Sequence, residues 1–378
     1  MKGESDFIDA LRQRVDAGTW RRGDTGTRGH GDPETRGHGD AGTRGHGDTE
    51  STASPRPRVS GSSSLRAGIG DDAAVFRSTA GKETVITADL LVEDIDFRRT
   101  TTPPYLLGHK ALAVSLSDIA AMGARPLWSM ISIGVPEDVW QTDFVERLYD
   151  GVLDLANGYG VQLIGGDTSR TTENIVIDSI VVGEATAGTP VLRSGASAGD
   201  QIFVTGSLGA AAAGLRLIER GAHLAEQNLG DEDSQKLDHI LLRQLRPEPR
   251  VGWGIVLGEE RLATSMIDLS DGLSSDLNHV CAASGVGAVI DSSLLPIDER
   301  VTELCGRRAL DPLQLALHGG EDFELLFTVK PGDVPRLPRR GDGVGIKCIG
   351  TIQSASEGVK ISEGPRTWEL KPGGWKHF

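Results

Sequence analysis

The sequence predicts an α/β (α+β) protein of two domains, and three observations support this class. The chain has 378 residues, more than one compact core normally organises. From Leu65 onward, short β-rich runs alternate with helical stretches. Acidic motifs flanked by glycine follow apolar runs in both halves, where predicted strands end. The periodicity is lost over residues 185–197, so we expect the domain boundary there.

In the first half, a short amphipathic helix is expected over residues 6–15, because Phe7, Ile8, Leu11 and Val15 recur near helical spacing. Two more helices are expected further along, at 106–122 with small residues on one side and at 142–159, where glycines end the helix. The expected strands lie at 84–87, 126–135, 162–164 and 175–184, the third running into a turn at Gly165-Gly166-Asp167.

The second half repeats the pattern of strand and helix. Strands are expected at 201–205, 263–268, 286–290 and 323–329, with helices at 210–220 and 274–283. A polar helical segment is expected over 224–238. After the strand at 323–329, we expect a C-terminal lobe with looser, less regular structure. The turn from Gly206 to Gly209 lacks the lysine of a phosphate-binding loop, so we interpret it as structural.

A low-complexity block interrupts the N-terminal region. Gly23 to His30 is followed by near copies at 31–38 and 39–46, a period of eight without an apolar residue to bury. The predicted division is therefore an N-terminal helix of the first domain (1–17), a disordered insertion (18–62), an N-terminal α/β domain (63–188) and a C-terminal α/β domain (189–378).

Composition excludes several classes of protein. The net charge of −15 argues against a nucleic-acid partner, which needs a basic surface. Three scattered cysteines are too few for a disulfide framework or a zinc pattern. No apolar stretch is long enough to cross a bilayer, and the first residues are acidic where a signal peptide would be apolar. We expect a cytoplasmic protein that acts without a membrane.

The acidic motifs carry the chemistry. Asp268, Ser270 and Asp271 lie around the end of a predicted strand, and two carboxylates beside a hydroxyl exceed what a helix cap needs. Asp118 lies inside an apolar helix, where a carboxylate requires a partner or a metal. The motifs Gly70-Asp71-Asp72, Thr87-Ala88-Asp89, Gly166-Asp167-Thr168 and Gly320-Glu321-Asp322 can each also be read as a turn or strand end. Together they favour a site for hard cations and phosphates.

In this order, the motifs resemble the thiamine-monophosphate kinase family of the AIR synthetase-related superfamily. The matching phrases are Gly68-Ile69-Gly70-Asp71-Asp72, Lys110 to Asp118, Gly165 to Thr168, Ile267 to Leu273 and Gly319 to Leu325. The resemblance implies a two-domain AIR synthetase-like fold with an N-terminal sheet domain that forms a homodimer. It also implies phosphorylation of thiamine monophosphate to thiamine diphosphate with ATP as co-substrate and several Mg²⁺ ions.

Roles for single residues follow from the resemblance alone. It implies a set of magnesium ligands made of Asp72, Thr87, Ala88, Asp89, Asp118, Asp167, Asp268 and Asp271, with Asp118 and Asp271 also catalytic. It places Gly166, Asp167, Arg193 and Ser270 at the nucleotide and Glu321 at the thiamine substrate. Asp96 replaces the family's histidine at a further substrate position. Because the accepting phosphate is already anionic, we expect direct in-line transfer without a phosphoenzyme.

Two alternatives remain at this point. One is another ATP-using enzyme of the same superfamily, although the chain has no cysteine in a Gly-rich N-terminal loop, as selenophosphate synthetase should, and does not end in one, as the hydrogenase-maturation member does. The other is a non-catalytic sensor of ATP or thiamine phosphate, suggested by Asp96.

Overall fold

The computed structural model describes residues 79–224, 232–307, 310–341 and 343–374, together with residues 65–67, 75–76 and six residues within 7–15. The predicted insertion at 18–62 and the predicted metal ligand Asp72 lie outside the described residues. Of the first predicted helix, Phe7, residues 10–11 and residues 13–15 are helical, and Phe7 and Leu11 are buried in the core.

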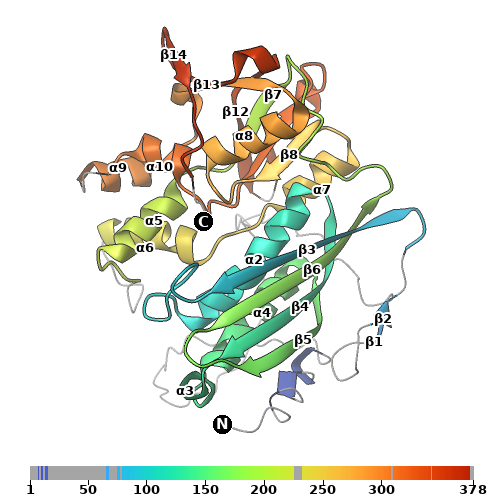
Figure 1. Ribbon diagram of the computed structural model, residues 1–378, viewed down its shortest axis with the longest axis vertical. Coiled ribbons are helices and arrows are strands. Elements are labelled where there is room, and N and C mark those ends of the chain that lie inside the picture. Colours follow the sequence, from blue (N-terminus) through green and yellow to red (C-terminus); the bar gives the residue numbers. More distant parts are fainter. Residues whose placement is uncertain are drawn as a thin grey trace, which may run out of the picture.

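The first half forms a four-stranded sheet with helices on one face. Its strand order is β3-β6-β4-β5, and all neighbours are antiparallel except the parallel pair β4–β5. Figure 1 shows the four strands side by side, with α2 and α4 behind them. The bounds are β3 (Lys82–Val92), α2 (Pro104–Ala121), β4 (Arg125–Val135), α3 (Glu137–Trp140), α4 (Phe144–Tyr159), β5 (Gln162–Arg170) and β6 (Val176–Thr186); a small separate pair is β1 (Leu65–Ala67) and β2 (Val75–Phe76).

The two faces of this sheet differ. On β3, Thr87 and Asp89 point toward α2, where both make side-chain hydrogen bonds, whereas Ile86 and Leu90 lie on the opposite face and are 64% and 60% exposed. This alternation follows from the two-residue period of a strand. The helix-covered face is part of the core. On the other face Ile86 and Leu90 are exposed, while Trp128 and Val182 form part of a small buried cluster.

The second half is built on an eight-stranded sheet. The strands follow the order β14-β13-β9-β12-β7-β10-β8, with β11 paired to β12. The strand bounds are β7 (Gln201–Thr205), β8 (Ser265–Asp268), β9 (Gly287–Asp291), β10 (Leu325–Val329), β11 (Arg340–Gly341), β12 (Val344–Gln353), β13 (Val359–Glu363) and β14 (Arg366–Glu369). The C-terminal lobe that we expected to be loose supplies β12 to the middle of this sheet, so that expectation is wrong.

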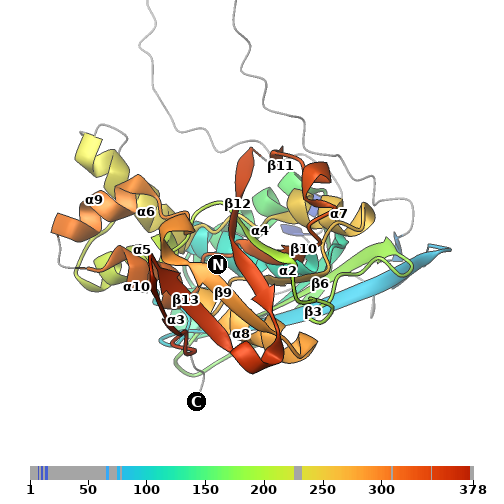
Figure 2. The ribbon, with the colours of Figure 1, turned by 90° about the horizontal axis from the view of Figure 1, so that it is seen from above.

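Helices cover the second sheet unevenly. They are α5 (Ala210–Glu219), α6 (Glu232–Leu245), α7 (Val251–Glu259), α8 (Leu273–Ser284), α9 (Glu299–Arg307) and α10 (Pro312–His318), with short 3₁₀ turns η2 (Ser292–Leu294), η3 (Val334–Arg336) and η4 (Ala355–Glu357). Figure 2 shows α5, α6, α9 and α10 gathered at one side of the sheet. None of the helices in the described ranges is long and apolar enough to span a membrane.

The cores of the two halves are continuous. One hydrophobic cluster contains Leu116 of α2 and Trp253 of α7 together with Phe203 and Phe327 of the second sheet. A second cluster lies on the other face of that sheet and includes Leu277 of α8. Helix α2 therefore packs against both sheets, and any side chain that it carries near its C-terminal end lies at the junction of the halves.

Candidate functional site at the junction of the two sheets

Three predicted metal ligands lie together where the two sheets meet. Asp89 comes from the middle of β3, Asp118 from the last turn of α2 and Asp268 from the end of β8. Electrostatic coupling links Asp118 to both of the others. Because β8 belongs to the second sheet, both halves of the chain contribute to this group of carboxylates.

Each of the three carboxylates accepts a hydrogen bond from a nearby hydroxyl. Ser115 donates to Asp89 over 2.7 Å, and Ser117 donates to Asp268 over 2.8 Å across the junction. Thr87, itself a predicted ligand, donates to Asp118 over 2.5 Å. Ser115 and Ser117 lie two residues apart on α2, which thus organises carboxylates from two different sheets. The neighbouring Ala88 is exposed on the opposite face of β3.

The local electrostatics disfavour three negative charges here. Burial and the charge of Asp118 raise the pKa of Asp89 to about 6. Burial and the same charge raise the pKa of Asp268 to about 7. Burial also raises the pKa of Asp118, against the opposing effects of Thr87 and of Arg193 on the loop after β6. Carboxylates in such a position become favourable as anions when a cation joins them.

The acidic motif after β8, with Ser270 and Asp271, lies beside the motif before β10, with Glu321, because these two strands are neighbours. β8 pairs with β10, and Asp268 stands opposite Leu325. The pairing continues into the loops, where the amide of Glu321 donates to the carbonyl of Ser270 over 2.8 Å. Gly320 packs so closely that a Cβ there would come within 2.5 Å of the Ser270 carbonyl. Ser270, Asp271 and Glu321 are thus part of one strand-end cluster.

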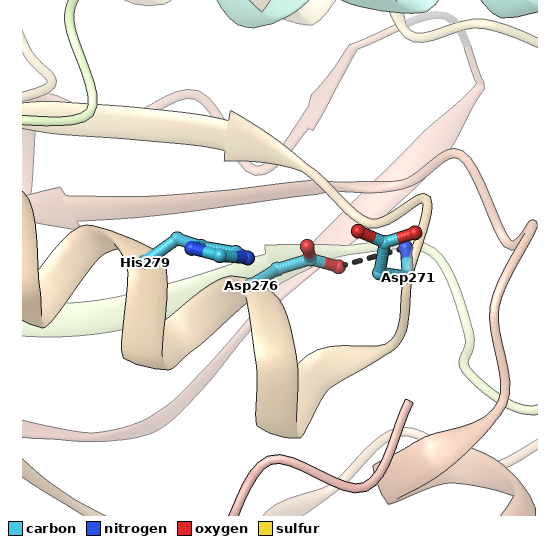
Figure 3. A group of neighbouring side chains, drawn as sticks. All are labelled: Asp271, Asp276 and His279. Carbon is cyan, nitrogen blue, oxygen red and sulfur yellow. Dashed lines mark hydrogen bonds between the residues drawn. The ribbon is translucent and has the colours of Figure 1, made fainter. Parts of the chain in front are cut away.

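Asp276 was not predicted as a site residue, although it lies in the first turn of α8. Its buried carboxylate accepts from the amides of Asp271 and Gly272 over 3.2 and 3.0 Å. Burial and the charges of Asp268 and Asp271 raise its pKa to about 8. Ligand atoms of Asp271, Asp276 and His279 lie within 4.8 Å of one another. Figure 3 shows these three side chains at the start of α8. An acid five residues after Asp271, at a helix start, was the available signal.

Glu321 makes contacts that sequence reasoning did not anticipate. The ammonium of Lys110 on α2 lies 2.6 Å from its carboxylate, and the side-chain amide of Gln244 on α6 donates to the same carboxylate. Its neighbour Asp322 is buried and accepts from the amides of Gly209 and Ala211, so it caps the start of α5. The interpretation of the Gly206–Gly209 turn as structural fits this contact.

Gly166 and Asp167 are far from this group within one chain. The predicted turn at Gly165-Gly166-Asp167 is wrong, because β5 continues through it to Arg170 and pairs with β4 along its length. β5 and β3 are opposite edges of the sheet, three strand spacings apart, which is about 14 Å. A Cβ at Gly166 would come within 1.9 Å of the Ile131 carbonyl, so only glycine fits there.

Two further predicted residues lie in loops. Arg193 is exposed, yet its charge lowers the pKa of both Asp118 and Asp268, which places it beside the carboxylate group. Asp96 accepts from the amide of Val92 over 2.8 Å and so closes the turn that follows β3. The structure thus shows Asp96 in a local turn contact.

Comparisons with known proteins agree with this architecture. Residues 70–185 match the N-terminal domain of AIR synthase related proteins, and residues 197–359 match the C-terminal domain. The thiamine-monophosphate kinase of Bacillus subtilis (strain 168) is 40% identical over 325 residues, which cover 85% of this chain and 96% of that protein.

Two solved structures are also similar. The thiamine-monophosphate kinase of Stenotrophomonas maltophilia K279a is 37% identical, with a TM-score of 0.71 over 80% of this chain and 92% of that chain. AaThiL complexed with AMPPCP and TMP is 33% identical, with a TM-score of 0.68 over 80% of this chain and 89% of that chain. The chain therefore belongs to the thiamine-monophosphate kinase family of the AIR synthase related proteins.

Proposed function

We propose that this chain catalyses the ATP- and magnesium-dependent phosphorylation of thiamine monophosphate to thiamine diphosphate. The observation that carries the proposal is the convergence of Asp89, Asp118 and Asp268 from both halves of a chain that belongs to this kinase family. A relative solved with an ATP analogue and TMP supports the same pair of substrates. The oxygen-rich, anionic site is suited to neutralising phosphate charge rather than to acid–base work on a neutral group.

The donor set fits magnesium. Carboxylates and hydroxyls are hard oxygen ligands, and the burial and mutual repulsion that raise the pKa values of Asp89 and Asp268 support the proposal of a cation beside them. We assign the ions to Asp89, Asp118, Asp268 and Asp271, with Thr87 and Ala88 adjacent and with Asp72 and Asp167 as further ligands implied by the family. Magnesium held by these residues would supply positive charge that neutralises the phosphates.

The chain's own residues position the two substrates. Arg193 lies near the carboxylate group, where its positive charge would attract a phosphate, and Ser270 lies at the strand end next to Asp271. Glu321 faces the acceptor substrate. In-line transfer then needs no base, because the attacking phosphate oxygen already carries charge. The role of Asp96 as a substrate residue stays a prediction.

We also propose a homodimer formed through the open face and edges of the first sheet. Ile86 and Leu90 are both exposed on that face of β3, and neighbouring exposed apolar side chains mark interaction surfaces. A dimer that set β5 of one copy beside β3 of the other would bring Gly166 and Asp167 to the carboxylate group. The domain division at residue 188 and the cytoplasmic location stay predictions.

An assay of thiamine diphosphate formation from ATP and thiamine monophosphate tests the function. We expect turnover that chelation of magnesium abolishes and that Asp271→Asn reduces by about a hundredfold or more while the fold is kept, because removing one charge-stabilising group typically costs that much. Asp333→Asn, at an exposed ion pair with Arg336, is the matched control and should keep the wild-type rate.

Two results would contradict the proposal. Binding of both substrates without any turnover would indicate a sensor in place of an enzyme. A labelled phosphoprotein that forms and decays at the rate of turnover would replace direct transfer with a two-step mechanism.

A further inference from the structure

The carboxylate of Glu321 is held from two sides by residues of two different helices. Lys110 of α2 places its ammonium 2.6 Å from one oxygen, and the amide of Gln244 on α6 donates to the other. The backbone amide of Glu321 is fixed as well, through its bond to the Ser270 carbonyl. Its φ of 66° is a left-handed value that a residue other than glycine adopts only when its surroundings enforce it.

Lys110 and Glu321 differ in how much of each side chain solvent can reach. The side chain of Lys110 is 3% exposed, whereas that of Glu321 is 29% exposed. A ligand therefore reaches the carboxylate and not the ammonium. At the same time the buried ammonium neutralises most of the carboxylate's charge, since the interaction of a close pair is strong where water is excluded.

The neutralised carboxylate retains its directional acceptors. An ionised carboxylate has about four lone-pair positions, and Lys110 and Gln244 occupy one on each oxygen. The amide oxygen of Gln244 is buried and has no hydrogen-bond partner among the described residues. The amide cannot be reversed, because its oxygen would then face a carboxylate that only accepts. The remaining lone-pair positions on the two oxygens of Glu321 thus offer two neighbouring acceptors, and Gln244 holds the carboxylate in place.

We propose that Glu321 recognises the acceptor substrate as a fixed hydrogen-bond acceptor for an amino group on its pyrimidine, and not as a counter-charge for its cationic thiazolium ring. Lys110 and Gln244 are the positioning residues, since Lys110 cancels the charge and the amide of Gln244 fixes the second oxygen of Glu321. This inference rests on the proposed function, which supplies the substrate. An –NH₂ group carries two donors, which matches the pair of acceptors.

Two substrate analogues separate the alternatives. One keeps the thiazolium cation but has a carbonyl oxygen in place of the pyrimidine amino group; the other keeps the amino group but has a neutral ring in place of the thiazolium. For the wild-type enzyme we expect KM and the binding constant to worsen about tenfold or more with the first analogue. The second should stay within about threefold of the natural substrate. The opposite ranking would overturn the inference.

Variants of the positioning residues give a second readout. Lys110→Met uncovers the charge of Glu321, so this variant should favour the natural cationic substrate over the neutral-ring analogue by about tenfold, while Lys110→Arg keeps the wild-type ratio. Gln244→Leu removes a hydrogen bond that holds Glu321, so this variant should discriminate less than the wild-type enzyme against the carbonyl analogue. Lys236→Met removes a paired surface lysine on α6 and is the control, with wild-type ratios expected. The KM for ATP should not change in any variant.

Failure of the inference is distinct from failure of the function. Wild-type enzyme that forms no thiamine diphosphate refutes the function. Wild-type enzyme that turns over while Lys110→Met and Gln244→Leu leave both analogue ratios unchanged refutes the inference only. If circular dichroism shows that Lys110→Met does not fold, the wild-type analogue ranking and Gln244→Leu still decide between the two outcomes.

Discussion

Glu324 illustrates how a single buried charge shapes the stability of this enzyme. Its carboxylate is fully buried and accepts from Arg250, Arg243 and Thr205. Burial alone would raise its pKa, but the two arginines outweigh burial and lower it from 4.5 to about 2. A carboxylate with a lowered pKa stabilises the fold above its unfolded pKa and loses that contribution as the pH falls through the folded value.

We therefore predict that Glu324→Gln destabilises the protein by about 3 kcal/mol at pH 7, the equivalent of the pKa shift. The difference from wild type should shrink as the pH falls from about 4.5 toward 2. Urea unfolding at several pH values measures it, with the exposed Glu363→Gln as the control. A difference that stays constant over this range would show that charge pairing is not the cause.

Single residues also show what the sequence could reveal about the site. Asp268 ends β8 and Glu321 lies just before β10, as expected, because apolar runs and glycines mark these strand ends in the sequence. Asp276 was missed because an acid in a first helical turn is ordinary, and only burial distinguishes it. The pairing of Lys110 with Glu321 joins residues far apart in the chain, and no local pattern encodes it.

Among the helices, the close packing of α2 on α4 depends on two glycines. A Cβ at Gly108 would lie 1.8 Å from the Leu148 carbonyl, and one at Gly151 would lie 1.9 Å from the Tyr105 carbonyl. Both obstacles are backbone atoms, so neither can turn away. Since α2 carries Lys110 and Asp118, a shift of this helix would also disturb the site.

We predict that Gly151→Ala lowers the free energy of unfolding by about 1–3 kcal/mol, despite the better helix propensity of alanine. It should also lower kcat, because Asp118 moves with α2. Chemical unfolding and the kinase assay measure the two effects. Gly345→Ala, where a Cβ meets open space, is the control and should be neutral. A neutral Gly151→Ala would mean that the helices separate without cost.

The prediction of elements succeeded where periodicity is strong and failed where tertiary pairing decides. The expected helix at 106–122 is α2 at 104–121, and the expected strand at 126–135 is β4. Gly165-Gly166-Asp167 was predicted as a turn from its composition, but β4 holds it in a strand. α7 was not predicted at all, since its buried apolar run shows no amphipathic period.

For the whole molecule, the position of Asp167 sets the strongest constraint. Within one chain the sheet separates Asp167 on β5 from Asp89 on β3 by its full width. If both hold magnesium, as the family implies, each complete site must take β3 from one copy and β5 from the other. The apolar face with Ile86 and Leu90 is the surface on which such copies would meet.

Mixed dimers test this arrangement. Asp89→Asn and Asp167→Asn should each abolish turnover, because each lacks one ligand in every site. Co-expression of the two variants in equal amounts should restore about a quarter of the wild-type rate, since half of the dimers are mixed and one of their two sites then has both aspartates. Ile86→Glu in both chains, which places a charge on the apolar face, should prevent the recovery. If mixing restores nothing while tagged chains prove that mixed dimers form, the two aspartates do not share a site between copies.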